Sequence, residues 1–150
     1  MSNAVQRIKR GAFAVISRLG LAVYSRFPIF GSLRASLGLI RDGDQVLVIQ
    51  RSDGRGLSLP GGLAYVWENS NHALVREILE ETGLLVTQAR FVFEYHASTD
   101  IPCFVSVFEV EAEGELSDSW EGCPCWLPLE EARTSMIASQ RRILDNLISN

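Results

Sequence analysis

Hydrophobic and polar residues follow strand-like patterns at several places from about residue 33 onward. Residues 35–41 and 45–51 flank Asp42-Gly43-Asp44, a turn sequence that is typical of a β-hairpin. A short extended piece is predicted at residues 57–59, after a polar loop. Residues 90–96 and 103–111 alternate in hydrophobicity and are predicted to be strands. The acidic segment 112–125 is predicted to be a loop.

Two other segments have the period of a helix. Residues 69–82 form one of them, and Gly83 follows as the expected C-terminal glycine. From Pro128 onward a single amphipathic helix is predicted, with one stripe formed by Leu129, Ala132, Met136, Gln140, Ile143 and Leu147. Strands interleaved with two helices predict an α/β (α+β) protein whose mixed sheet is covered on both faces.

The helix at residues 69–82 carries the candidate chemistry. At about 100° per residue, Glu77, Glu80 and Glu81 fall on an arc of about 100°, while Leu74, Val75, Ile78 and Leu79 are predicted to face the core. Arg76 can pair with Glu80 at i+4 but cannot neutralise all three carboxylates. Three glutamates alone fit either a solvated acidic face or a site for a hard divalent cation.

The residues around this helix carry a longer motif. Gly62 is followed after five residues by Glu68 and after seven more by Arg76-Glu77-Ile78-Leu79-Glu80-Glu81-Thr82-Gly83-Leu84. This resembles the signature of the Nudix hydrolases, G-x5-E-x7-R-E-U-x-E-E-x-G-U, at every defined position. The resemblance implies a Nudix-like α/β/α sandwich with a mixed sheet over residues 33–150.

The resemblance also implies the roles of the motif residues. Glu80 and Glu81 would be metal ligands together with the backbone carbonyl of Gly61, and Glu77 would be a further ligand or the general base. Arg76 would orient Glu68 and Glu77. The implied cofactor is Mg²⁺, with Mn²⁺ as a substitute, because divalent ions neutralise phosphate oxygens and activate water.

Three residues outside these ligands are further candidates. Glu121, in the predicted late loop, is either the general base or a solvated loop acid. Trp67 stands where many family members carry glycine, and either stacks on a base or ribose or packs on the sheet as a rim aromatic. Arg51, at the end of the second predicted strand, is a substrate-binding candidate.

The resemblance predicts a pyrophosphohydrolase acting on a nucleoside diphosphate linked to another group, with a nucleoside triphosphate as the default substrate. An ADP-ribose-type or other nucleotide-sugar substrate is the alternative, and a non-catalytic nucleotide-binding module is a further one. His72 and His96 are expected to be structural. The cysteines, Cys103, Cys123 and Cys125, are odd in number and fit inert thiols in a reducing, cytoplasmic compartment.

Charge is distributed unevenly along the chain. Residues 1–41 carry seven basic and no acidic side chains, and the remainder carries seven basic against 18 acidic ones, a net charge of −11. We therefore expect no binding to a nucleic acid polymer. Residues 1–32 are expected to contain a basic amphipathic helix, whose residues 4–25 either dock on the acidic domain or a second copy, or lie on an anionic membrane surface.

Overall fold

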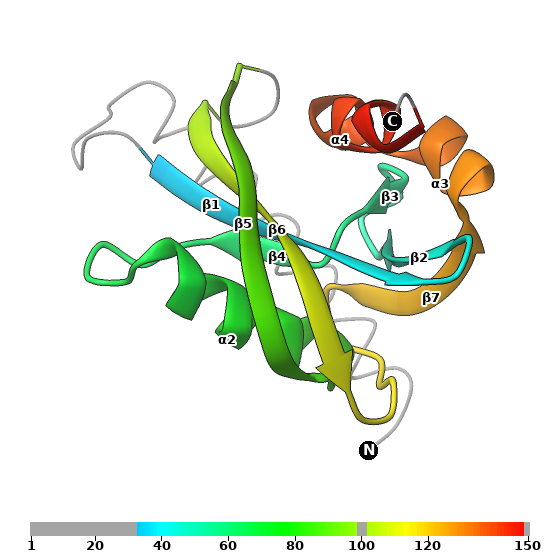
Figure 1. The fold of residues 1–150 in the computed structure, drawn as a ribbon, viewed down its shortest axis with the longest axis horizontal. Coiled ribbons are helices and arrows are strands. Elements are labelled where there is room, and N and C mark those ends of the chain that lie inside the picture. The colour runs from blue at the N-terminus through cyan, green and yellow to red at the C-terminus, as the bar shows by residue number, and fades with distance from the viewer. Residues whose placement is uncertain (1–32, 99–101, 149–150) are drawn as a thin grey trace.

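The computed structural model describes residues 33–98 and 102–148 of the chain (Figure 1). The expected basic helix within residues 1–32 lies outside the described residues. The helices and strands, in chain order, are β1 (Leu33–Asp42), β2 (Gln45–Arg51), β3 (Leu57–Ser58), β4 (Gly61–Leu63), α2 (Ser70–Thr82), β5 (Leu85–Ala97), β6 (Cys103–Glu113), β7 (Gly122–Pro128), α3 (Leu129–Ser135) and α4 (Ala138–Ile148).

The sheet is mixed, as the sequence predicts, and β1 is its central strand. β1 pairs in parallel with β6 along the register from Leu33↔Cys103 to Ile40↔Val110. On its other edge β1 pairs antiparallel with β4 and, further along, with β2. β2 continues the sheet by pairing with β3 and β7, and β5 closes the opposite end against β6. The predicted hairpin at residues 42–44 is therefore confirmed.

Two of the predicted strand boundaries are wrong. β5 begins at Leu85, five residues before the start expected from the sequence, because it pairs with β6 over its whole length. The predicted loop 112–125 ends early, since β7 occupies residues 122–128 and pairs with β2. The sequence hides this strand because it does not alternate and contains Pro124, a residue that usually argues against a strand.

The single C-terminal helix predicted from the hydrophobic stripe is also wrong. The structure has two helices, separated at Met136, whose backbone is extended with φ −67° and ψ 141°. Met136 forms a β-bridge with Leu57, and the Ile137 N–H donates to the Leu57 carbonyl over 2.9 Å. These backbone bonds to β3 replace helical bonds and interrupt the helix while leaving its apolar stripe buried.

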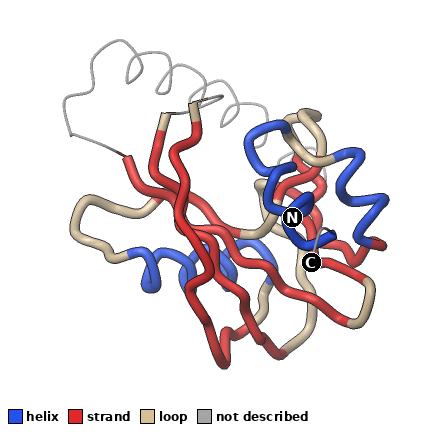
Figure 2. Tube along the Cα trace, turned by 45° about the horizontal axis from the view of Figure 1, so that its top comes forward, coloured by secondary structure: helices blue, strands red, loops and turns tan. Residues whose placement is uncertain are grey.

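Helices cover both faces of the sheet, as expected (Figure 2). On one face, α2 packs over a cluster that includes Ile40, Leu74, Ile78 and Phe108. On the other face, α3 and α4 contribute Ala132, Ile143 and Leu144 to a larger cluster. The chain is thus an α/β/α sandwich. No helix among the described residues is long and apolar enough to cross a membrane.

Candidate active site

Helix α2 is bounded by clear capping interactions. The Asn69 side chain accepts a hydrogen bond from the His72 N–H over 2.8 Å at the start of the helix. At the other end Gly83 adopts φ 78°, a left-handed conformation that favours glycine, and its N–H donates to the Leu79 carbonyl. The predicted extent of this helix is confirmed to within one residue.

The buried face of α2 differs from the predicted one. Leu74 and Ile78 are fully buried, as expected, but Val75 and Leu79 are 39% and 47% exposed. The residues that replace them on the buried face are Ala73, Glu77, Glu81 and Thr82. The helix contacts β1 and β4, the strand that contains Gly61 and Gly62. Its buried face, which includes Glu77 and Glu81, therefore lies against this strand.

Gly62 makes room for one of these carboxylates. A Cβ atom added at Gly62 would lie 2.7 Å from the carboxyl carbon of Glu77, closer than real side chains approach. Glycine at this position therefore allows the helix to approach β4 with a carboxylate between them. The first glycine of the motif is explained by this close approach.

Arg76 connects three of the motif glutamates. Its Nε and Nη2 atoms donate to the two carboxylate oxygens of Glu68 at 3.0 and 2.9 Å. Its Nη1 atom donates to Glu77 at 2.8 Å and to Glu80 at 3.3 Å. These contacts raise the pKa of Arg76, chiefly through the hydrogen bond to Glu68, and lower the pKa of Glu68. We call Arg76 with Glu68, Glu77 and Glu80 the Arg76 network.

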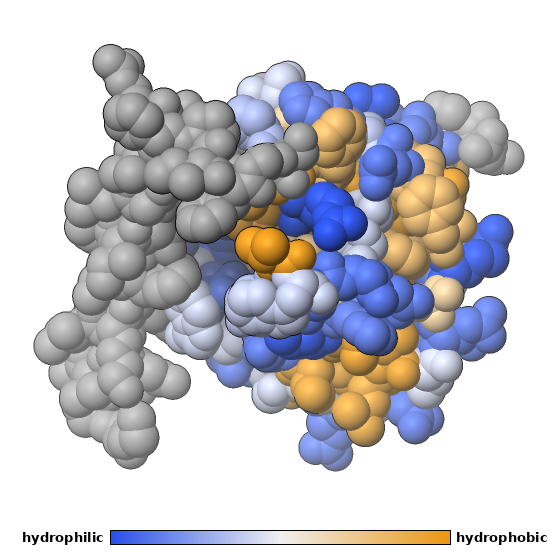
Figure 3. Space-filling model, turned by 90° about the vertical axis from the view of Figure 1, so that its left-hand side faces the viewer, coloured by the Kyte–Doolittle hydropathy of each residue, from blue (hydrophilic) through white to orange (hydrophobic). Residues whose placement is uncertain are grey.

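Two aromatic residues extend this network outward. The Tyr65 ring lies over the Arg76 guanidinium at 4.2 Å, and Trp67 stacks on Tyr65 with ring centroids 5.3 Å apart. Trp67 is 85% exposed, so the expectation that it packs on the sheet is wrong. Short-range contacts within its own loop hold the ring instead. Figure 3 shows this side of the molecule, where hydrophobic side chains lie in separate patches among hydrophilic ones.

The fourth motif glutamate has different surroundings. Glu81 is 6% exposed and accepts a hydrogen bond from the Gly61 N–H over 2.8 Å. Its carboxyl group also lies next to the Glu121 side chain. Burial raises the pKa of Glu81 well above its usual value, and the neighbouring Glu121 raises it further. We call these two residues the Glu81–Glu121 pair.

Glu121 is therefore not a solvated loop acid. It lies directly before β7, and its backbone carbonyl accepts from the N–H of Ser52 over 2.8 Å. The Ser119 hydroxyl accepts from the Glu121 N–H at 3.2 Å, so the loop is held at both sides. Burial raises the pKa of Glu121, and Arg51 opposes that shift. β2 and β7 bring this residue to the helix from 40 positions further along the chain.

Arg51 is held beside the carboxylates by an ion pair. Asp53 accepts from its Nε atom at 3.0 Å and from its Nη2 atom at 2.5 Å. Arg55 donates to the same carboxylate at 3.1 Å. These hydrogen bonds, led by that from Arg51, lower the pKa of Asp53. One carboxylate thus positions two guanidinium groups, that of Arg51 at the end of β2 and that of Arg55 in the following loop.

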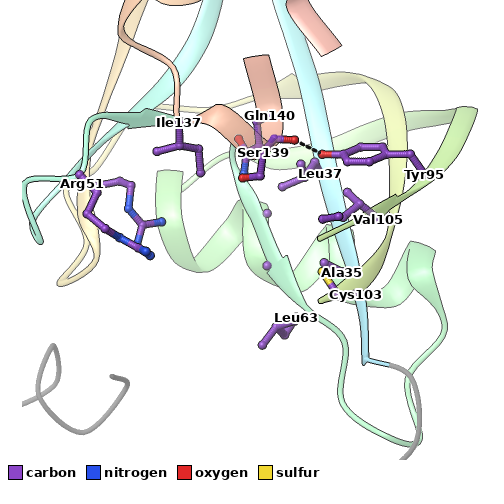
Figure 4. A pocket seen from close by; sticks show the side chains of 14 residues that line it. Ala35, Leu37, Arg51, Leu63, Tyr95, Cys103, Val105, Ile137, Ser139 and Gln140 are labelled. Carbon is purple, nitrogen blue, oxygen red and sulfur yellow. Dashed lines mark hydrogen bonds between the residues drawn. The ribbon is translucent and has the colours of Figure 1, made fainter. Parts of the chain in front are cut away.

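Both arginines border a cavity of about 160 Å³ between the sheet and the start of α4 (Figure 4). Gly61 and Gly62 form part of its wall, which places the cavity next to the carboxylates. Its apolar lining includes Ala35, Leu37, Val105 and Ile137. Its polar lining consists mainly of Tyr95, Ser139 and Gln140. The Tyr95 hydroxyl donates to the Ser139 carbonyl over 2.7 Å, and burial raises the pKa of Tyr95 to about 12.

The donor set fits a hard divalent cation by its chemistry. Carboxylates of α2 and Glu121 lie together beside the backbone of Gly61 and Gly62, and oxygen ligands suit Mg²⁺ or Mn²⁺. The like charges of the Glu81–Glu121 pair also favour a cation between them. Over residues 33–98 and 102–148, no three His, Cys, Asp or Glu side chains are already arranged around a common metal position.

The histidines and cysteines do not join this site. His72 lies in the first turn of α2, and the His96 ring meets the edge of Phe104 with centroids 5.1 Å apart. Cys103 is buried, and Cys123 and Cys125 are partly buried in β7, all as free thiols. Cys103 lines the cavity, where burial raises its pKa.

Comparison with known proteins agrees with the fold and the motif. A family model described as the NUDIX domain matches residues 32–147, so the chain belongs to the Nudix family. It is a Nudix hydrolase, an enzyme that acts on pyrophosphate bonds. No curated protein matches the chain significantly.

Several solved structures are similar. The MutT protein from Bacillus halodurans is 25% identical with a TM-score of 0.67, covering 79% of this chain and 83% of its own. The ORF135 protein of E. coli is 22% identical with a TM-score of 0.68, covering 79% and 89%. The MutT NUDIX hydrolase from Burkholderia pseudomallei is 20% identical with a TM-score of 0.67, covering 76% and 96%. The last two show a shared fold.

Sequence reasoning missed the cavity residues Arg55, Tyr95 and Gln140. Arg55 lies in a segment whose composition predicts only a polar loop. Tyr95 lies in an alternating strand pattern, which does not indicate its hydrogen-bond partner. Gln140 gave the clearest signal, because it is the one amide on an otherwise apolar helical stripe.

Proposed function

We propose that this protein hydrolyses a phosphoanhydride bond in a nucleoside diphosphate linked to another group, with a nucleoside triphosphate as its default substrate. One observation carries the proposal. The α2 carboxylates and Glu121 gather next to a cavity bordered by two arginines, Arg51 and Arg55. The carboxylates can attract cations, the guanidinium groups can bind phosphates, and the partly open cavity can take the base or ribose of a nucleotide substrate.

We further propose that Glu77, Glu80, Glu81 and the Gly61 carbonyl hold a divalent cation, Mg²⁺ or Mn²⁺. Such an ion, when bound, neutralises phosphate oxygens and lowers the pKa of a water molecule. Arg76 fixes the orientation of Glu77 and Glu80 through its hydrogen bonds at 2.8 and 3.3 Å. Glu121 adds a carboxylate that faces Glu81 from another element.

Glu77 and Glu121 are the two candidates for the general base, and the contacts favour Glu121. A Glu77 oxygen already accepts from Arg76, which lowers its basicity. Burial raises the pKa of both carboxyl groups, but of the two only Glu77 is ion-paired with an arginine among the described residues, so Glu121 is the better proton acceptor. The pH–rate profile tests this assignment, because Glu121→Gln should remove its acidic limb while Glu77→Gln should leave that limb in place.

The substrate's two ends are assigned to two regions. Arg51 and Arg55, both held by Asp53, would bind phosphate oxygens outside the cation site. The cavity between β1, β6 and α4 would take the nucleobase or ribose, since its walls are largely apolar. Stacking of a base or ribose on the exposed face of Trp67 stays a prediction, which Trp67→Ser would test through the KM.

A substrate panel with Mg²⁺ tests the proposal. Nucleoside triphosphates should release a mononucleotide and pyrophosphate, and Glu80→Gln and Glu81→Gln should each abolish most of that release. Hydrolysis of ADP-ribose or a nucleotide sugar in preference to every triphosphate would reassign the substrate. Binding of Mn²⁺ and nucleotide by isothermal titration without any phosphate product would identify a non-catalytic module.

For the basic segment 1–32 we propose a unit separate from the domain at residues 33–150. The support is its charge, which is opposite to that of the rest of the chain. Sedimentation with vesicles of anionic lipid compares the full chain with one that starts at Leu33. Greater sedimentation of the full chain at low salt would support a peripheral membrane surface, and equal sedimentation would leave docking on the domain or on a second copy.

A further inference from the structure

We propose that one end of the domain binds the surface of an anionic lipid membrane through the loop between β4 and α2. Three consecutive side chains of this loop, Tyr65, Val66 and Trp67, are 48%, 73% and 85% exposed. We call these three residues, together with Arg34 and Phe104, the tip surface. The inference is separate from the proposed hydrolase function, because binding to a membrane requires no turnover.

The end of helix α2 leaves part of the sheet uncovered. The Ser36 hydroxyl donates to the Ser70 carbonyl over 2.7 Å, so the helix begins above Ser36 and runs from there toward Gly38. Residues two positions apart on a strand share a face, so Arg34 lies on the same face as Ser36 but beyond the helix. Phe104 pairs with Arg34 in the parallel register and is 38% exposed. A basic and an aromatic side chain therefore lie side by side on this uncovered face.

The loop between β4 and α2 adjoins these two residues. The Ala64 N–H donates to the Arg34 carbonyl over 2.8 Å, which fixes the start of the loop against β1. Figure 1 shows the start of β1 and this loop on the same side of the molecule. The five residues of the tip surface thus belong to one end of the domain.

The most exposed part of the loop is a tight turn. The Glu68 N–H donates to the Tyr65 carbonyl over 2.9 Å, so Val66 and Trp67 are the two central residues of the turn. Central turn positions usually carry Gly, Pro, Asn or Asp, and a valine followed by a tryptophan is an unusual choice. Trp67 stacks on Tyr65, which lies over the Arg76 guanidinium. Because the turn is already held in this way, little conformational entropy is lost when it binds.

The charges near the tip surface suit an anionic partner. Glu68, the one acidic residue of the loop, is paired with Arg76 at 2.9 Å, and Arg34 adds a positive charge. Residues 1–32, which enter the domain at Leu33 beside the tip surface, carry five basic and no acidic side chains. Basic residues close to a membrane are attracted by the negative surface potential of anionic lipids.

The rest of the domain favours a single orientation on the membrane. Residues 42–150 carry a net charge of −11 and would be repelled by anionic lipids. Only the end that bears the tip surface combines exposed apolar groups with a nearby basic segment. A membrane would therefore be met at this end.

The size and composition of the tip surface favour lipid over a second copy of the chain. A stable protein interface involves about 20–30 residues on each side, whereas the tip surface has five. Tryptophan and tyrosine are the side chains enriched where membranes meet water, because their rings are apolar with one polar group. A small apolar turn of this kind can enter the headgroup layer while nearby basic residues contact the lipid phosphates.

Vesicles that contain phosphatidylglycerol test this inference with the full chain, and vesicles of phosphatidylcholine alone are the neutral comparison. With the anionic vesicles, Trp67 fluorescence should shift to shorter wavelength and should be quenched by lipids with brominated tails. Trp67→Ser should remove most of this signal, although Trp120 and Trp126 remain. Binding should weaken as the salt concentration rises, because salt screens the attraction.

Val66→Ser is the sharpest variant, because the side chain is largely exposed and its loss should leave the fold intact. It should weaken binding to anionic vesicles by about fivefold, and Arg34→Gln in the same protein should weaken it by about fivefold more. Leu85→Ser is the matched control. Leu85 is 56% exposed and pairs with Glu113 at the opposite end of the sheet, so this variant should bind like the wild type. Thermal unfolding checks that each variant is folded.

Several outcomes would overturn the inference. They are equal sedimentation with anionic and neutral vesicles, and unchanged binding in the folded Val66→Ser and Arg34→Gln double variant. A dimer that dissociates in Val66→Ser, seen by sedimentation velocity without lipid, would give the tip surface to a second copy instead. Quenching of Trp67 by a nucleotide but not by vesicles would give it to the substrate. Hydrolysis of nucleotides is assayed without vesicles, so the proposed function is tested separately.

Discussion

Two groups of carboxylates meet at helix α2 and have different surroundings. Glu68 accepts two hydrogen bonds from Arg76, and this contact lowers its pKa. Glu81 instead faces Glu121, and burial together with this neighbour raises its pKa. The first group contains the guanidinium of Arg76, whereas no ion pair among the described residues joins the second group to a basic side chain.

This difference indicates that the Arg76 network has a structural role and that the Glu81–Glu121 pair is the part that a cation would stabilise. The Arg76 network ties the loop at Tyr65 to α2 through side-chain and backbone bonds, since Arg76 also donates to the Leu63 carbonyl over 3.1 Å. The Glu81–Glu121 pair gains most from an added positive charge, because two buried carboxylates in contact cannot both ionise easily. Breaking each group should therefore affect different properties.

The largest effect is expected from the loss of a carboxylate on the cation side. Glu81→Gln should lower kcat/KM for the best nucleotide by about a thousandfold, because the carboxylate proposed to bind the ion loses its charge. A phosphate-release assay measures this effect. Glu113→Gln, an exposed glutamate at the end of β6, is the matched control and should leave turnover unchanged. Full activity in Glu81→Gln would remove the basis of the comparison.

Divalent cations should stabilise the wild-type protein. At about 100 times its Kd, Mg²⁺ or Mn²⁺ should add about 2.7 kcal/mol to the free energy of unfolding, because the ion binds the folded state. Thermal unfolding with and without EDTA measures the shift. In Glu81→Gln the shift should shrink, and an equal shift in both proteins would place the ion elsewhere.

Loss of the Arg76 guanidinium should lower the stability of the folded protein by disrupting the Arg76 network. Arg76→Ala should lower the free energy of unfolding by about 1–3 kcal/mol, because it leaves partly buried carboxylates without their donor. Urea unfolding measures this change. Arg90→Ala breaks the exposed pair with Glu109 and should change stability by less than about 1 kcal/mol. Equal losses in the two variants would show that the Arg76 network has no special structural role.

The smallest expected effect is a pH dependence of the metal-free protein. Glu77, Glu81 and Glu121 have pKa values above the usual 4.5. The folded protein therefore keeps protons that the unfolded chain has released, so the free energy of unfolding should fall as the pH rises above about 4.5. Each pKa unit of difference corresponds to about 1.4 kcal/mol.

Chemical denaturation between pH 5 and 8 in EDTA measures this trend. The lowered pKa values of Asp53 and Glu68 act below this window, where their stabilisation is lost as the pH falls. The slope should flatten in Glu81→Gln, which has no buried carboxyl to titrate at that position. A stability that rises with pH through the window would contradict the raised values.

Local signals predicted the elements that local chemistry controls. The Asp-Gly turn and the capped helix ending at Gly83 follow the sequence closely, because a few neighbouring residues determine each of them. The prediction failed at β7 and at Met136, where pairing with β2 and β3 decides the backbone conformation. It also failed for Val75 and Leu79, since hydrophobicity alone placed them inside while Glu77 and Glu81 occupy the buried face.

The sequence by itself determined the family, the extent of the helix and the identity of the clustered glutamates, because all of these lie within one continuous motif. Only the tertiary structure decided that Glu121 meets Glu81, that Asp53 holds two arginines at a cavity, and that Leu59 orients the amide of Gln140. These contacts either join positions far apart in the chain or depend on the conformation of a loop. Their energies depend on burial and distance, which no pattern of residue types specifies.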